Sequence, residues 1–149
     1  MSPPKASILF VATTTAVIAS CDTMYGLDRS SVLQTMPDIA CIRSSIKATP
    51  GVLEVQEHSD AAQRQYVFRY RGAPGSRVIG VLQVGPSAGV DDIVMRNGIT
   101  DINIVPPAED IKATRPVMVE MERLIAARCG VSAADMIEHC NGPSCLAED

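Results

Sequence analysis

The sequence predicts an α+β domain in which helices pack on one face of an antiparallel sheet of four to five strands. Three strand-like runs follow one another between residues 52 and 84, and the short polar turns between them favour antiparallel neighbours. Segments with helical spacing of apolar residues stand before and after these runs. The 149 residues suffice for one domain, and 46% hydrophobic against 20% charged residues is an ordinary globular balance.

The first predicted helix covers residues 36–48. Thr35 is a suitable N-cap, and Pro37 lies in the first turn, where its missing N–H costs nothing. Thr49-Pro50-Gly51 is expected to end the helix. One face carries the apolar residues at i, i+3 and i+7: Ile39, Ile42 and Ile46.

Three strands are predicted next, at residues 52–55, 66–70 and 78–84. The turns between them fall at residues 58–62 and 72–75. Because these connections are short and polar, consecutive strands are expected to be neighbours in a meander.

Residues 86–107 allow two interpretations. Asn97-Gly98 between two apolar runs indicates a hairpin with a type I′ turn. In the alternative, a short helix over residues 90–95 precedes a strand. Pro106-Pro107 ends the segment in both cases.

A second helix is expected to follow Pro116 and to end before Gly130, which suits the position just past a helix. Its apolar stripe comprises Val117, Met118, Met121, Leu124 and Ile125. Ser132 and Asp135 are expected to open a short third helix. The inward residues of that helix would be Met136, Ile137 and Cys140.

The first twenty-one residues have the features of an export signal. Lys5 gives a short positive region, and residues 8–18 form an apolar run that is too short for the about 20 residues of a membrane span. The run ends in Ile18-Ala19-Ser20-Cys21, which resembles the lipobox of bacterial lipoproteins. The resemblance implies removal of residues 1–20 and attachment of fatty-acid chains such as palmitate to Cys21. The alternatives are an ordinary secretory signal and a buried N-terminal strand.

The lipobox also predicts the domain organisation and the location. Residues 21–35 are expected to be the lipidated cysteine and a tether, and residues 36–149 a single periplasmic domain. The anchor lies in the cell membrane of a Gram-negative bacterium and faces the periplasm. Asp22 favours the inner membrane, because in some of these bacteria an aspartate there retains a lipoprotein; the outer membrane is the alternative.

Four cysteines remain once Cys21 is lipidated, and an even number in an exported chain indicates two disulfides. The favoured pairing is Cys140 with Cys145 and Cys41 with Cys129. The rival pairing is Cys129 with Cys140 and Cys41 with Cys145. A metal site at His139, Cys140 and Cys145 is a weaker alternative, because the chain has no C-x-x-C motif.

Composition and motifs exclude several functions. A net charge of −4 and an aromatic content of 3% argue against nucleic acid as a partner. His58 and His139 are the only histidines, and neither stands in a pattern typical of a catalytic base. No cofactor, metal or catalytic residue is therefore predicted, and the domain is expected to act by binding.

The candidate binding residues are Arg69 and Arg71, which share one face of the second strand. They would meet an acidic protein or cell-envelope partner. The alternative is a solvated strand face on which Glu54 or Glu57 pairs with them. We therefore expect a lipid-anchored, non-catalytic binding domain, more specifically an immunity or inhibitor protein. The alternative function is a small periplasmic hydrolase or a metal carrier.

Overall fold

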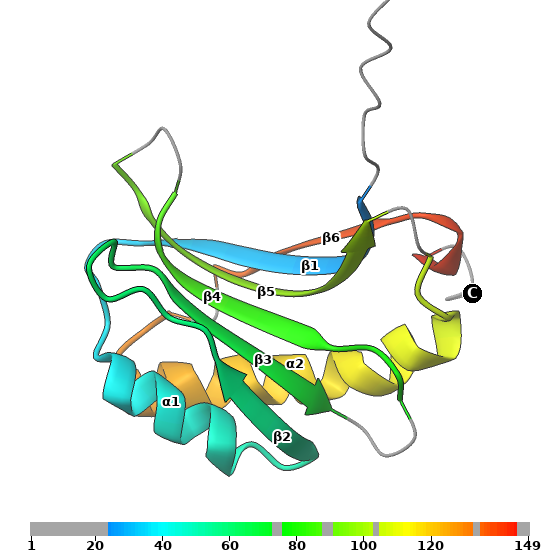
Figure 1. The fold of residues 1–149 in the computed structure, drawn as a ribbon, viewed down its shortest axis with the longest axis horizontal. Helices are drawn as coiled ribbons and strands as arrows, with labels where there is room; N and C mark the ends of the chain where they lie inside the picture. Colours follow the sequence, from blue (N-terminus) through cyan, green and yellow to red (C-terminus); the bar gives the residue numbers. More distant parts are fainter. Residues whose placement is uncertain (1–23, 73–75, 88–90, 103–104, 133–134, 146–149) are drawn as a thin grey trace, which may run out of the picture.

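The computed structural model describes residues 24–72, 76–87, 91–102, 105–132 and 135–145. These residues form one antiparallel sheet of six strands, two α-helices and a short 3-10 helix (Figure 1). Both α-helices lie against the same face of the sheet, and no described element covers the other face (Figure 1). The predicted α+β class is confirmed, with six strands in place of four to five.

The strand order in the sheet differs from the order in the chain. The elements are β1 (Met24–Leu33), α1 (Ile39–Ala48), β2 (Val52–Glu57), β3 (Tyr66–Gly72), β4 (Gly80–Pro86), β5 (Ile93–Ile102), α2 (Ala108–Cys129), β6 (Ile137–Asn141) and η1 (Pro143–Cys145). The sheet runs β2-β3-β4-β5-β1-β6. The expected meander of three strands is present as β2, β3 and β4, and β5, β1 and β6 extend the sheet beyond it.

β1 consists of residues that we expected in the tether. It pairs with β5 along its whole length and with β6 from Gly26 to Ser30. The prediction of a tether is therefore wrong for residues 24–33. Two of the positions that face the helices carry Arg29 and Ser31, so the sequence lacks the apolar alternation that indicates a strand.

The N-cap of α1 lies three residues later than predicted. Asp38, not Thr35, is the N-cap, and its Oδ1 accepts a hydrogen bond from the backbone N–H of Ala40 at 2.9 Å. The helix ends where expected, with Thr49 at the C-cap. Ile42 and Ile46 are fully buried.

The hairpin expected within residues 86–107 is wrong, and of the alternative interpretation the strand is right and the helix is wrong. Residues 93–102 form one strand, in which Asn97 lies opposite Leu82 on one side and Arg29 on the other. Asn97 is fully buried between the sheet and α2. The Asn-Gly pair therefore serves side-chain packing and hydrogen bonding, and the backbone makes no turn there.

α2 begins at Ala108, well before Pro116, which lies inside the helix and is exposed. The helix ends as predicted, with Gly130 in the left-handed region at φ 69°. Its buried residues are Ile111, Thr114, Met118, Met121, Glu122 and Ile125. The predicted stripe is thus partly right, although a charged residue lies within it.

The predicted third helix is wrong, because Ile137–Asn141 form β6 at the edge of the sheet. Pairing with β1 places Ile137 opposite Ser30, on the face that no described helix covers. Ile137 is consequently 73% exposed instead of inward. Cys140 is half-buried against the core.

Two disulfides close the fold. Cys41 of α1 is bonded to Cys129 at the end of α2, and their Cα atoms are 5.7 Å apart. Cys140 of β6 is bonded to Cys145 of η1. This is the pairing that the sequence favoured. The first disulfide holds the two helices together, and the second holds the last described turn against the edge strand.

Candidate functional site

The two candidate arginines lie on the uncovered face of the sheet. β3 alternates, so that Phe68 and Tyr70 are buried against the helices while Arg69 and Arg71 are exposed. Tyr66 at the start of the strand is half-buried. β3 therefore turns its aromatic side chains towards the helices and its two arginines towards the uncovered face.

Neither arginine has an acidic partner within the described parts of the chain. Glu54 and Gln56 of β2 lie opposite them in the strand register. Glu57, the other expected partner, instead pairs with Arg43 of α1, with 2.7 Å between Arg43 Nε and the Glu57 carboxylate. No ion pair with a described residue therefore holds either guanidinium group in place, and Glu54 is the acidic residue that lines the smaller hollow with both arginines.

The arginine pair borders two hollows that share Arg69 and Ile79. The smaller, of about 130 Å³, lies over β2 and β3. The larger, of about 340 Å³, lies where β4 begins and α2 approaches the sheet. Its lining includes Arg69, Arg77, Ile79, Val81, Val105 and Asp110. Its volume is at the lower end of the range of small-molecule sites.

Charge and apolar surface meet in the larger hollow. Ile79 and Val105 are 43% and 39% exposed, although both are large and apolar. The charged residues of its lining are two arginines and one aspartate. A basic, partly apolar hollow on a protein with a net charge of −4 favours an acidic or amphipathic partner there.

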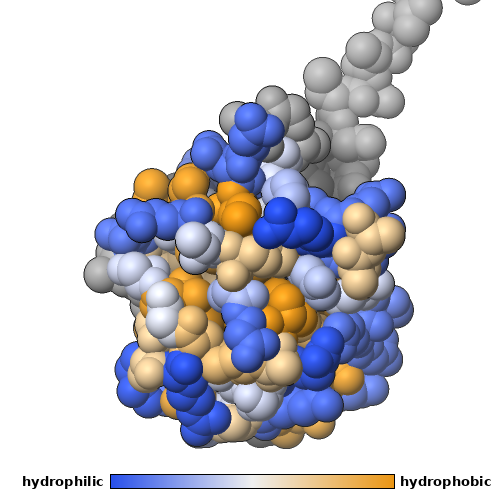
Figure 2. Space-filling model, turned by 90° about the vertical axis from the view of Figure 1, so that its left-hand side faces the viewer, coloured by the Kyte–Doolittle hydropathy of each residue, from blue (hydrophilic) through white to orange (hydrophobic). Residues whose placement is uncertain are grey.

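The opposite end of the sheet has a mixed surface. Figure 2 shows that hydrophobic residues occur there in small groups between hydrophilic ones. Val32, near the end of β1, is 63% exposed. Single exposed apolar residues are common on soluble domains and do not by themselves define a site.

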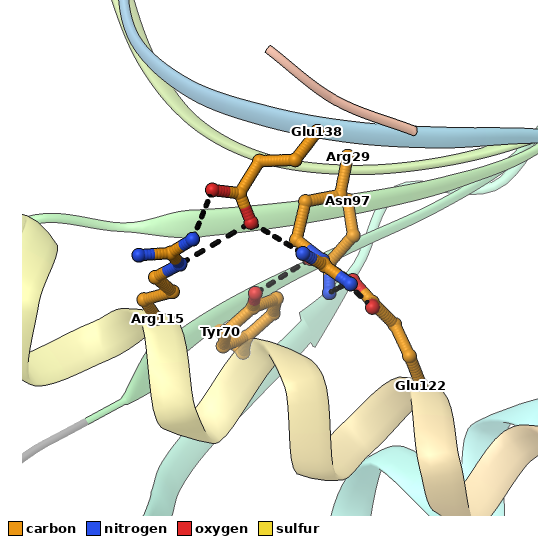
Figure 3. A network of polar contacts seen from close by, with 6 residues as sticks. All are labelled: Arg29, Tyr70, Asn97, Arg115, Glu122 and Glu138. Atoms are coloured by element: carbon orange, nitrogen blue, oxygen red, sulfur yellow. Dashed lines mark hydrogen bonds and ion pairs between the residues drawn. The ribbon is translucent and has the colours of Figure 1, made fainter. Parts of the chain in front are cut away.

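A second polar cluster, which we did not predict, is buried between the sheet and α2 (Figure 3). Arg29 Nε donates to both carboxylate oxygens of Glu122, at 3.0 and 2.8 Å. Asn97 Nδ2 donates to the same carboxylate at 3.1 Å, and Tyr70 Oη donates to Asn97 Oδ1 at 2.6 Å. Residues of β1 and β5 thus donate directly to one carboxylate of α2, and Tyr70 of β3 joins the cluster through Asn97.

The cluster continues to the edge strand through Glu138 of β6. Arg29 Nη1 donates to this carboxylate from one side. Arg115 of α2 donates from the other, with Nε at 3.2 Å and Nη2 as a second donor. Glu138 therefore lies between two arginines and ties β6 to both β1 and α2.

Burial dominates the electrostatics of this cluster. It raises the pKa of the Glu122 carboxyl above its ordinary value, although Arg29 and Asn97 oppose the shift. Burial lowers the pKa of Arg29, but hydrogen bonds and charge from Glu122 and Glu138 reverse this, so the net shift is upward. Burial also raises the pKa of the Tyr70 hydroxyl, which stays protonated.

The contacts of the cluster join β1, β3, β5 and β6 to α2. Among the described residues, no buried side-chain nitrogen or oxygen lacks a hydrogen-bond partner. One sequence signal points to it: Glu122 interrupts the apolar face of α2 next to Met121. Its partners could not be found, because Arg29 lies 93 positions away in the chain.

The two histidines lie apart on the surface. His58 follows β2 and is exposed, and His139 is exposed on β6 opposite Asp28. Within the described ranges no three His, Cys, Asp or Glu side chains gather in a way that could hold a metal ion. Cys140 and Cys145, the possible metal ligands beside His139, are bonded to each other.

The predicted lipid site, Cys21, lies outside the described residues, as does Asp22. Of the helices that the structure describes, none is long and apolar enough to cross a membrane. β1 begins at Met24, so only Asp22 and Thr23 separate Cys21 from the sheet.

Comparison with known proteins identifies no relative: no family model, no curated protein and no solved structure matches the chain. By its fold and surface, the chain is an α+β domain with two disulfides and an uncovered, basic sheet face.

Proposed function

We propose that this protein is a membrane-anchored periplasmic lipoprotein whose domain binds a partner and performs no catalysis. Cys21 carries the lipid, and Arg69 and Arg71 contact the partner. The observation that carries the proposal is that both guanidinium groups are exposed on the uncovered sheet face without an acidic partner among the described residues. The partner is a protein with an acidic surface.

Three features support the anchor and the compartment. The tetrapeptide Ile18-Ala19-Ser20-Cys21 fits the lipobox, and the apolar run before it is shorter than a membrane span. Two disulfides in a chain of this size fit an oxidising compartment. Two or three acyl chains would hold the protein firmly, whereas a single chain binds membranes only marginally.

An immunity or inhibitor protein is the specific form of the proposal. Enzymes that cleave cell-wall glycans typically carry two carboxylates on either side of the bond that they hydrolyse. Two exposed arginines on one face of a strand have the charge that such a cleft would attract. Complementary charges also speed the encounter of partners and penalise wrong ones.

The test is capture of envelope proteins by the lipidated protein after chemical cross-linking. Arg69→Glu with Arg71→Glu should abolish capture of the partner, because reversing charges at a complementary interface costs several kcal/mol. The same variant should change the free energy of unfolding by less than about 0.5 kcal/mol, since both side chains are exposed.

The matched control is Lys112→Glu with Arg128→Glu, which makes the same change in net charge at exposed positions of α2. It should leave capture unchanged. Equal yields of the same cross-linked partner from the native protein and the Arg69→Glu, Arg71→Glu variant would refute the proposed surface.

A further inference from the structure

The distance between the proposed lipid and the folded sheet is short. Cys21 and Met24 are three positions apart, and an extended chain spans at most about 3.6 Å per residue. Met24 therefore lies within about 11 Å of the lipid-bearing residue. A tether of the fourteen residues 22–35 would instead have spanned at most about 46–50 Å and held the domain clear of the membrane.

The strand register shows which end of the sheet this is. Met24 pairs with Ile102 near the end of β5, and Leu27 pairs with Ile99. On the other side of β5, Gly98 pairs with Val81 near the start of β4. The start of β1, the end of β5 and the start of β4 thus lie at one end of the sheet (Figure 1). The larger hollow lies at the same end, because Ile99 and Val81 both line it.

The side chains at this end suit a lipid headgroup layer. Ile79 and Val105 are exposed beside the hollow. Arg77 is exposed next to them, and within the described parts of the chain it has no acidic partner. Arginine binds phosphate with several donors, and its apolar stem can lie along hydrocarbon while the charged end stays in the polar layer.

We propose that this end of the domain rests on the membrane surface, with Ile79 and Val105 among the lipid headgroups and Arg77 at their phosphates. The inference rests on the proposed lipidation of Cys21. Arg69 lines the same hollow, so the partner-binding face adjoins the membrane. The proposed partner is then a protein that presents its acidic surface close to the bilayer.

The experiment uses tryptophan fluorescence, because the chain has no tryptophan of its own. Ile79→Trp and Val105→Trp place a reporter at the proposed contact. Val32→Trp is the matched control at the other end of β1, eight positions from Met24 and about 27 Å away along the strand. All three sites are exposed apolar residues, so each should accept the larger side chain.

The full lipidated variants are inserted into vesicles of phosphatidylethanolamine and phosphatidylglycerol, with and without bromine on the acyl chains near the headgroups. Brominated lipid should quench Ile79→Trp and Val105→Trp and leave Val32→Trp unchanged. Adding Cys21→Ser to Val105→Trp should abolish both flotation with the vesicles and quenching.

Two results would overturn the docked orientation, and they differ in what they say of the anchor. Protein that floats with vesicles but shows no quenching at Ile79→Trp and Val105→Trp, or equal quenching at all three sites, refutes the orientation and leaves the anchor intact. Protein that does not float refutes the lipid anchor and, with it, the orientation.

Discussion

Replacing Arg29 with methionine would leave the Glu122 carboxylate buried without its cation. In the native protein Arg29 Nε lies 2.8 Å from one carboxylate oxygen, and the side chain of Glu122 is 2% exposed. Breaking a buried ion pair by removing one partner costs about 3–5 kcal/mol, because the remaining charge is uncompensated. We expect a large loss in the free energy of unfolding at pH 7.

Proton uptake limits this loss. The carboxyl has an ordinary pKa of 4.5, so protonating it at pH 7 costs at most 2.5 pH units, or about 3.4 kcal/mol at 1.36 kcal/mol per unit. Once protonated, Glu122 carries no charge that needs a cation. The electrostatic part of the loss is therefore at most about 3.4 kcal/mol at pH 7, and at most about 2 kcal/mol at pH 6.

The sign of the pH dependence follows from the folded-state pKa. Burial already raises the pKa of Glu122, so the native fold binds its proton more tightly than the unfolded chain does. Stability contributed by this group is present at low pH and is lost as pH rises through the folded pKa. Without Arg29 that pKa rises further, so the variant should approach native stability as pH falls toward 4.5.

Urea unfolding followed by circular dichroism at pH 7 and pH 5 measures the effect. Arg29→Met should lose more stability at pH 7 than at pH 5, and Arg29→Met with Glu122→Gln should lack this difference. Arg123→Met is the control, because its ion pair with Glu120 is exposed and contributes about 0–1 kcal/mol. An Arg29→Met loss that is equal at both pH values would show that the charge of Glu122 does not cause it.

Two further changes test the packing of the fold. Serine at both positions of the Cys41–Cys129 disulfide should lower the free energy of unfolding by about 4.6 kcal/mol, whereas serine at Cys140 and Cys145 should lower it by about 2 kcal/mol. The difference arises because the first disulfide closes a separation of 88 residues and the second one of 5. Equal losses in denaturant titrations would contradict this expectation. Gly80→Ala would place a methyl carbon 2.2 Å from the buried ring of Tyr70. It should therefore lower the free energy of unfolding by about 1–3 kcal/mol. An unchanged melting temperature would contradict this packing.

Elements with local signals were predicted well. The α1 helix has apolar residues at helical spacing and a stop signal, and β3 alternates cleanly between buried and exposed residues. The exposure of Arg69 and Arg71 follows from that alternation alone. Their lack of partners does not follow from it, because Glu57 turns to Arg43 of α1, a residue 14 positions away.

Elements whose inward residues are polar were missed. β1 presents Arg29 to the helices, and this is favourable only because Glu122 and Glu138, from distant parts of the chain, meet it there. Asn97 looked like a turn residue because its partners, Tyr70 and Glu122, are 27 and 25 positions away. Local patterns cannot report partners that only the tertiary fold brings together.

The correction to β1 also changes the functional expectation. A tether would have separated the lipid from the domain, but the sheet begins at Met24. The surface that we propose for a partner and the surface that we propose for the membrane would therefore be neighbouring parts of one end of the molecule. This proposed arrangement on the membrane depends on the lipidation of Cys21.

Mass spectrometry of the N-terminal peptide of protein purified from membranes tests that modification most directly. We expect a mature chain that begins at Cys21, with a diacylglyceryl group on its thiol, and we expect Cys21→Ser to move the protein from the membrane fraction to the soluble fraction. A mature chain that begins at another residue, or that carries an unmodified Cys21, would contradict it.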